Sequence, residues 1–270
     1  MAALELTVRS QPSRPPIVVL GASNVSRGLV RLAAITRART GGPADLFVAA
    51  GHGRSYGVNS RVALRRLPSI LGCGLWRALD REQAAIGEPT APLALVTDIG
   101  NDLLYGFAVD QVAAWVRETV QRLADRGATI AITRLPLASI AGVGPFRYRA
   151  LRTCYVPGCR LTLDEMKSAA QRLDEAVVAI AGDFGAIVVE QPGDWYGVDA
   201  IHVRRRRLDD FWWRVCGVWG VPEAVAPGMP TFRDWARLGS QSAEVRSLGQ
   251  VMRFTPQPVV QRPGLRLWLY

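Results

Sequence analysis

Five short apolar runs alternate with longer amphipathic segments along the first 220 residues of the chain. The runs span residues 17–20, 45–50, 93–97, 128–133 and 186–190. They are almost continuously apolar, which is typical of strands buried on both faces. The segments between them carry apolar residues at helical spacing, as in 109–124. This alternation predicts a three-layer α/β/α sandwich around a five-stranded parallel, doubly wound (flavodoxin-like) sheet.

The β–α rhythm stops near residue 220, and this sets the expected domain organisation. At 270 residues the chain fits one large domain with an extension. We expect a leader over 1–15 that adds at most an edge strand, an α/β domain over 16–220, and a proline-rich C-terminal extension over 221–270. The extension should wrap the domain or meet a partner rather than build a second core. Within the domain we expect a helix over 60–71 and irregular structure over 136–160.

The charge of the chain narrows its possible partners. The formal net charge is +10, and nearly all the positive charge is arginine. We interpret this excess as a compositional bias rather than as a nucleic-acid surface, because no recognition motif accompanies it. The arginine run 204–207 is expected to be a solvated face, with attraction of an anionic substrate as a further hypothesis.

Metal, cofactor and membrane functions have little support in the sequence. The four cysteines show no C-x-x-C spacing and there are only two histidines, so we expect neither a metal site nor a cofactor. Cys154 and Cys159 lie close enough in the chain to pair across a loop. The first 16 residues lack the apolar stretch of a secretory signal, and no run is long enough to span a bilayer. The expected location is cytoplasmic.

Polar residues follow four of the five predicted strands. They are Ser23, the glycines of 51–57, Asn101, and Asp199 with His202. Because the carboxyl ends of parallel strands meet at one edge of a sheet, we expect these residues to converge there. The strand–turn–helix unit at 16–28 is suited either to a nucleophile with oxyanion donors or to a phosphate at a helix N-terminus.

The same motifs, in the same order, resemble the blocks of the SGNH (GDSL-type) hydrolase superfamily. G-A-S-N at 21–24 resembles the nucleophile block, G-H-G at 51–53 the second block, G-N-D at 100–102 the third and D-A-I-H at 199–202 the last. The resemblance covers residues 17–202. Two positions depart from it: Ala22 stands where the family often has aspartate, and Ile99 stands where the third block has glycine.

The resemblance implies a serine hydrolase, of esterase or deacetylase type, that cleaves an ester or acyl group through an acyl-enzyme on Ser23. His202 would be the general base, and Asp199 would orient it. The partner would be a small-molecule ester or acylated substrate. Oligomerisation through the extension is a further possibility that the sequence leaves open.

The resemblance also implies an oxyanion hole. Its donors would be the backbone N–H of Ser23, a second-block glycine N–H and the side-chain amide of Asn101. We favour Gly53 over Gly51 as the glycine. We also expect Asp102 to brace the loop beside Asn101.

Two other expectations concern the neighbourhood of the site. His52 should order the glycine loop or line the pocket. Aromatic residues should wall an acyl or alcohol pocket; the candidates are Phe146, Tyr148, Tyr155, Trp195 and Tyr196.

Other functions stay open at this point. Ser23 would be an ordinary helix N-cap in a non-catalytic protein that binds a phosphate or nucleotide on the same fold. However, the turn lacks both common nucleotide-binding glycine motifs. An acyltransferase would use the same residues as a hydrolase.

Overall fold

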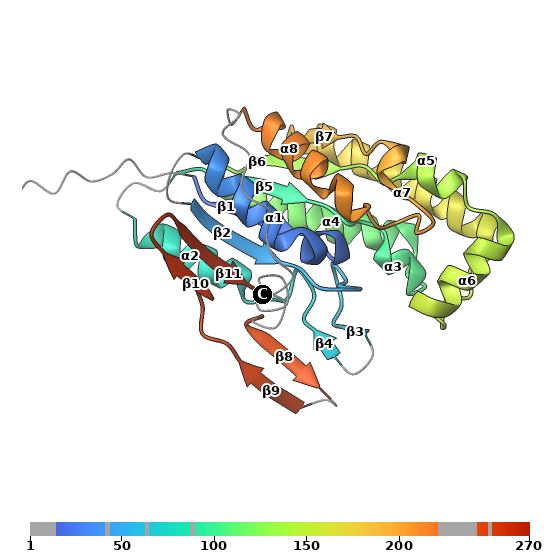
Figure 1. Cartoon of the computed structure of the whole chain (residues 1–270), viewed down its shortest axis with the longest axis horizontal. Helices are drawn as coiled ribbons and strands as arrows, with labels where there is room; N and C mark the ends of the chain where they lie inside the picture. Colours follow the sequence, from blue (N-terminus) through green and yellow to red (C-terminus); the bar gives the residue numbers. More distant parts are fainter. Residues whose placement is uncertain (1–14, 41–43, 63–64, 87–89, 221–241, 248–249) are drawn as a thin grey trace, which may run out of the picture.

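The centre of the molecule is a seven-stranded sheet in the order β10-β11-β2-β1-β5-β6-β7 (Figure 1). The computed structural model describes residues 15–40, 44–62, 65–86, 90–220, 242–247 and 250–270. Five parallel strands correspond to the predicted runs: β1 (Ile17–Leu20), β2 (Ala44–Ala49), β5 (Leu93–Val96), β6 (Thr129–Thr133) and β7 (Ile187–Val189). Their spatial order is the flavodoxin-like order, so the predicted α/β/α sandwich is confirmed.

Helices cover both faces of this sheet. One face carries α1 (Ser23–Thr40) and α8 (Leu208–Val218), which lie side by side (Figure 1). The other carries α2 (Leu75–Ala84), α4 (Val109–Ala124) and α7 (Leu163–Phe184). Alternate residues of β1 supply the two cores, with Val18 and Leu20 on the α4–α7 side and Ile17 and Val19 on the α1–α8 side.

Shorter helices gather around the carboxyl ends of the strands. They are α3 (Asn101–Leu104), α5 (Leu137–Ala141), α6 (Pro145–Tyr155) and the 3-10 turns η1 (Gly193–Trp195) and η2 (Arg205–Arg207). The expectation of irregular structure over 136–160 is therefore wrong. Pro145 stands in the first turn of α6, where its missing N–H breaks no helical hydrogen bond, so this proline starts a helix instead of interrupting one.

The expected helix over 60–71 is also wrong. This segment forms the hairpin of β3 (Ser60–Val62) and β4 (Arg65–Leu67). The hairpin belongs to a second, antiparallel sheet of order β3-β4-β8-β9, whose other strands are β8 (Glu244–Ser247) and β9 (Gln250–Phe254). The partner of β4 thus comes from a distant part of the chain, and a local apolar pattern cannot reveal it.

The C-terminal segment adds two strands to the central sheet, which makes seven instead of the predicted five. Strand β11 (Leu265–Leu269) runs parallel to β2, and β10 (Val260–Arg262) pairs with it antiparallel. Trp268 is fully buried and stacks on Phe47 at 4.3 Å between ring centroids. The guanidinium of Arg266 pairs with Asp45 on β2. Residues 267–269 of β11 are therefore part of the core of the α/β unit.

The remaining sequence expectations concern the leader, the extension, the cysteine pair and membrane-spanning segments. The leader lies almost wholly outside the described residues, as does the stretch 221–241 of the extension. Cys154 and Cys159 are both free thiols. None of the helices described is both long and apolar enough to cross a bilayer.

The burial of Trp268 yields a first prediction. Trp268→Ala should lower the free energy of unfolding by about 3 to 5 kcal/mol, because it removes a fully buried indole and leaves a cavity against Phe47. Denaturant unfolding followed by circular dichroism measures this loss. The control is Phe254→Ala, whose side chain is 72% exposed and whose loss should change stability by no more than about 0.5 kcal/mol. Equal effects of the two changes would contradict a core role for β11.

Candidate active site

Ser23, His202 and Asp199 form one hydrogen-bonded chain at the carboxyl edge of the sheet. Ser23 begins α1 just after β1, and the other two lie in the loop between η1 and η2. The Nε2 atom of His202 lies 2.7 Å from Oγ of Ser23, and its Nδ1 lies 2.5 Å from Oδ2 of Asp199. Ser23 is only 6% exposed. The structure thus brings together the three residues that the motifs single out.

The surroundings of Asp199 favour its ionised form. Burial acts to raise the pKa of this carboxyl, but hydrogen bonds from His202, from the Ile201 amide at 3.3 Å and from the Tyr155 hydroxyl at 3.0 Å act against it. Together with the electrostatic interaction between Asp199 and His202 they hold the pKa of Asp199 below its ordinary value. An ionised Asp199 fixes the imidazole ring so that Nε2 faces Ser23.

Asn101 presents a hydrogen-bond donor beside Ser23. It is the first residue of α3, and both residues line the same cavity. The side-chain nitrogen of Asn101 is buried and has no hydrogen-bond partner among the described residues. Gly100 precedes it at φ 126°, a conformation that favours glycine and turns the chain into α3. Buried amides are rarely left unpaired, so this nitrogen is a candidate site for a ligand oxygen.

The second-block glycines are placed differently. Gly53 has a φ of 65°, and its carbonyl accepts a 2.6 Å hydrogen bond from the Tyr105 hydroxyl. Among the described residues that line the cavity, neither Gly51 nor Gly53 is included, so the glycine donor stays a prediction. His52 is exposed and does not line the cavity either.

Asp102 holds the second-block loop in place. It is fully buried and accepts the backbone N–H of Tyr56 at 3.0 Å, and burial raises the pKa of its carboxyl. The Tyr56 hydroxyl in turn donates to the carbonyl of Thr97 at 2.6 Å, at the end of β5. Asp102 therefore braces the second-block loop, whereas the sequence reasoning assigned it to the loop beside Asn101.

Asp98 organises the turn that carries Ser23, a role that the sequence reasoning missed. Its Oδ2 accepts the backbone N–H groups of Ala22 at 2.8 Å, Asn24 at 2.9 Å and Val25 at 3.3 Å. A carboxylate at the first turn of a helix is favoured by the exposed N–H groups and by the helix dipole. Ala22 has no carboxylate of its own, and Asp98 supplies one from the end of the neighbouring strand β5.

Asn24 links this turn to the histidine loop. Its side-chain nitrogen donates to Oδ1 of Asp98 at 2.7 Å and to the carbonyl of Ile201 at 3.1 Å. Its side-chain oxygen accepts the N–H of Val203 at 2.8 Å. The backbone on both sides of His202 is therefore hydrogen-bonded to the residue after Ser23. The sequence held one signal for this network, since Asp98 directly follows the predicted strand 93–97. In the structure the φ of Asp98 is 57°, which is uncommon for a residue other than glycine.

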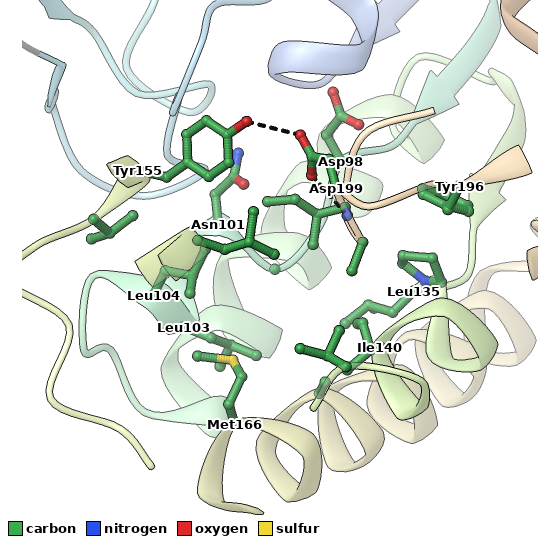
Figure 2. A pocket seen from close by; sticks show the side chains of 18 of the residues that line it. Asp98, Asn101, Leu103, Leu104, Leu135, Ile140, Tyr155, Met166, Tyr196 and Asp199 are labelled. Atoms are coloured by element: carbon green, nitrogen blue, oxygen red, sulfur yellow. Dashed lines mark hydrogen bonds between the residues drawn. The ribbon is translucent and has the colours of Figure 1, made fainter. Parts of the chain in front are cut away.

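A cavity of about 120 Å³ opens beside Ser23. Figure 2 shows Asp98, Asn101 and Asp199 at one end of it and Met166 at the other. Of the aromatic residues expected to wall a pocket, three line the cavity, namely Tyr148, Tyr155 and Tyr196. Two do not, because Phe146 is 88% exposed and Trp195 is buried in the core beneath α8.

Helix α6 lines this cavity and is hydrogen-bonded near both of its ends to the same loop. Near its start, the Arg147 guanidinium donates to the carbonyls of Gly197 and Val198, each at 2.5 Å. At its end, the Tyr155 hydroxyl donates to Asp199. Both contacts are with the loop that carries Asp199, so α6 and this loop form a continuous wall at the cavity mouth.

The arginine run lies outside the cavity. Residues 204–206 are exposed, and Arg207 pairs with Asp194 and with Asp210, each at 2.9 Å. This matches the expected solvated face. Attraction of an anionic substrate by these side chains stays a hypothesis.

The contacts of Asp98 yield a second prediction. Asp98→Ala should lower the free energy of unfolding by about 1 to 3 kcal/mol, because the N–H groups of the first turn of α1 lose their acceptor. Chemical denaturation measures this change. Asp183→Ala is the matched control, since it removes an exposed carboxylate paired with Arg117 and should cost no more than about 1 kcal/mol. If both variants lose the same small amount, Asp98 does not organise the turn.

No protein-family model and no curated protein matches this sequence. Among solved structures, the native M. smegmatis aryl esterase is similar with a TM-score of 0.50 and 11% identity, covering 77% of this chain and 100% of that one. A lipolytic G-D-S-L family member from Veillonella parvula has a TM-score of 0.48 and 11% identity, over 77% of this chain and 99% of that one. The esterase EstA from Pseudoalteromonas sp. has a TM-score of 0.45 and 16% identity, over 75% of this chain and 97% of that one.

At these sequence identities the similarity concerns the architecture alone, and it rests on the M. smegmatis aryl esterase. It agrees with the order of the five parallel strands and with the family suggested by the four motifs. The chain has the fold of the M. smegmatis aryl esterase, and this is the α/β/α sandwich that the resemblance to the SGNH (GDSL-type) superfamily implies.

Proposed function

We propose that this protein hydrolyses carboxylic esters through an acyl-enzyme on Ser23. The observation that carries the proposal is the uninterrupted chain of hydrogen bonds from Ser23 Oγ through His202 to Asp199. A serine that serves only as a helix cap has no need of an imidazole at 2.7 Å with a carboxylate behind it. This arrangement is instead the one that converts a hydroxyl group into a nucleophile.

The proposed reaction uses each group in turn. His202 Nε2 takes the proton from Ser23 Oγ as the oxygen attacks the ester carbonyl carbon. The resulting imidazolium is stabilised by Asp199 and returns the proton to the alcohol oxygen as the ester C–O bond breaks. A water molecule then enters, gives one proton to His202 and attacks the acyl-enzyme, and the proton passes back to Ser23 as the carboxylic acid leaves.

Asn101 is the best-supported donor to the oxyanion formed in both steps. Its side-chain nitrogen is buried, has no hydrogen-bond partner within the described part of the chain, and lies on the same cavity as Ser23. The backbone N–H of Ser23 is a second proposed donor, and Asp98 engages the N–H groups on either side of it rather than its own. The Gly53 N–H is the third, on the strength of the motif resemblance. The esterase named among the structures of the same fold supports an ester as the substrate.

Covalent labelling tests the nucleophile directly. We expect a fluorophosphonate probe to label the wild-type protein and to fail on Ser23→Ala and on His202→Ala, with a parallel loss of hydrolysis of a short aryl ester. Ser26→Ala is the matched control, because Ser26 lies one turn further along α1 and should keep the label. Intact-mass spectrometry and peptide mapping identify the labelled residue. A folded wild-type protein that takes no label would contradict the proposal.

Substitutions of Asn101 and Asp199 should lower kcat by different amounts. Asn101→Ala should lower kcat about 100- to 1000-fold with little change in KM, as expected for a donor that acts on the oxyanion. Asp199→Asn should lower kcat by about 10⁴-fold, because the amide no longer holds the imidazole in the reactive tautomer. Steady-state kinetics on the aryl ester measure both. An Asn101→Ala variant with wild-type kcat would remove this residue from the oxyanion hole.

A further inference from the structure

The cavity beside Ser23 is lined mainly by apolar side chains. Beyond Asp98, Asn101 and Asp199 it is walled by apolar side chains from three helices that meet at the carboxyl edge of the sheet (Figure 2). Residues of this apolar part include Leu103 and Leu104 of α3, Ile140 of α5 and Met166 of α7. A long apolar space that begins at a nucleophile suits one apolar arm of the substrate.

We propose that this cavity binds the acyl chain of esters of linear, medium-length fatty acids, with the chain running from Ser23 toward Met166. The inference rests on the ester hydrolysis proposed above and adds the substrate class. The cavity volume of about 120 Å³ counts the positions that the centre of a water molecule can occupy. On this scale one water molecule needs roughly 10 to 15 Å³, so the cavity holds on the order of ten heavy atoms.

Several polar groups of the inner wall already have hydrogen-bond partners. The Tyr196 hydroxyl donates to the Gln191 side chain, whose own nitrogen donates to the backbone of Arg134, each at 2.5 Å. The guanidinium of Arg152 donates to the Leu161 carbonyl at 3.2 Å and lies 5.8 Å from the centre of the Tyr148 ring. A polar chain that is buried along the apolar side chains would lose hydrogen bonds to water, whereas an alkyl chain has none to lose.

The position of the catalytic groups assigns the cavity to the acyl arm rather than to the alcohol. Ser23 and Asn101 line it, whereas His202, which is also among the described residues, does not. The oxyanion is part of the acyl group and must face Asn101. The alcohol oxygen must face Nε2 of His202 to receive its proton, which directs the alcohol away from the cavity.

A pair of isomeric esters tests this assignment on the wild-type protein. Ethyl octanoate and octyl acetate have the same formula and nearly the same hydrophobicity, but they carry the long chain on opposite sides of the ester bond. We expect kcat/KM to be at least tenfold higher for ethyl octanoate, measured by pH-stat titration of the released acid. A preference for octyl acetate, or none, would overturn the proposal.

Blocking the cavity provides a second test. Along a series of p-nitrophenyl esters, kcat/KM should rise about fourfold for each added methylene that is buried, until the chain fills the cavity near octanoate to decanoate. Met166→Trp on α7 and Leu104→Trp on α3 each narrow the space, and each should lower the octanoate-to-acetate ratio of kcat/KM at least tenfold. Val178→Trp on the outer face of α7, where Val178 is 39% exposed, should leave the ratio unchanged. Thermal melts show that each variant is folded.

The failure of this inference is distinguishable from failure of the proposed function. Labelling by a short ethyl fluorophosphonate needs Ser23 and His202 but does not need the inner cavity. Labelling with a flat chain-length profile, unaltered by both tryptophan variants, would overturn the acyl-chain assignment and leave the hydrolase in place. Absence of Ser23-dependent labelling would overturn both.

Discussion

The contact on which the site depends most is that of the Asp98 carboxylate with the first turn of α1. One oxygen accepts three backbone N–H groups around Ser23, and the other accepts the side chain of Asn24. Through Asn24 the same carboxylate is connected to the backbone that flanks His202. Three loops from three strands are thereby held in one arrangement, in which Ser23 and His202 lie within hydrogen-bonding distance.

The sheet makes this convergence possible. Strands β1 and β5 are neighbours in the parallel sheet, with Leu20 in register with Val96, so the turns after them are adjacent. The short helices α3, α5 and α6 then surround the gap above the strand ends, and their apolar faces create a cavity instead of filling it. The polar groups of the candidate site lie at the border of that apolar space, where electrostatic interactions are less screened than in water.

Much of this could be predicted from the sequence because it depends on local patterns. Continuous apolar runs indicate buried parallel strands, and residues that follow such strands must meet at one edge; Ser23, Asp199 and His202 do so. The missed features depend on contacts between distant segments. Strand β4 pairs with β8, β11 pairs with β2, and Asp98 bonds to a turn more than seventy residues earlier. A residue's type alone does not reveal such a partner, and Asp98 in a turn has many simpler explanations.

The pairing of β11 with β2 has a consequence for how the chain folds. Until residues 265–269 have been synthesised, β2 is an edge strand with a row of unpaired backbone groups, and Phe47 lacks the indole that covers it. The five-stranded arrangement can form during synthesis from residues that lie near one another in the sequence, but its last partner arrives after a loop of some two hundred residues. Closing so long a loop is slow relative to local pairing. The nascent domain therefore passes through a stage in which the sheet edge that carries Ser23 is formed while β2 is still open to pairing with other strands.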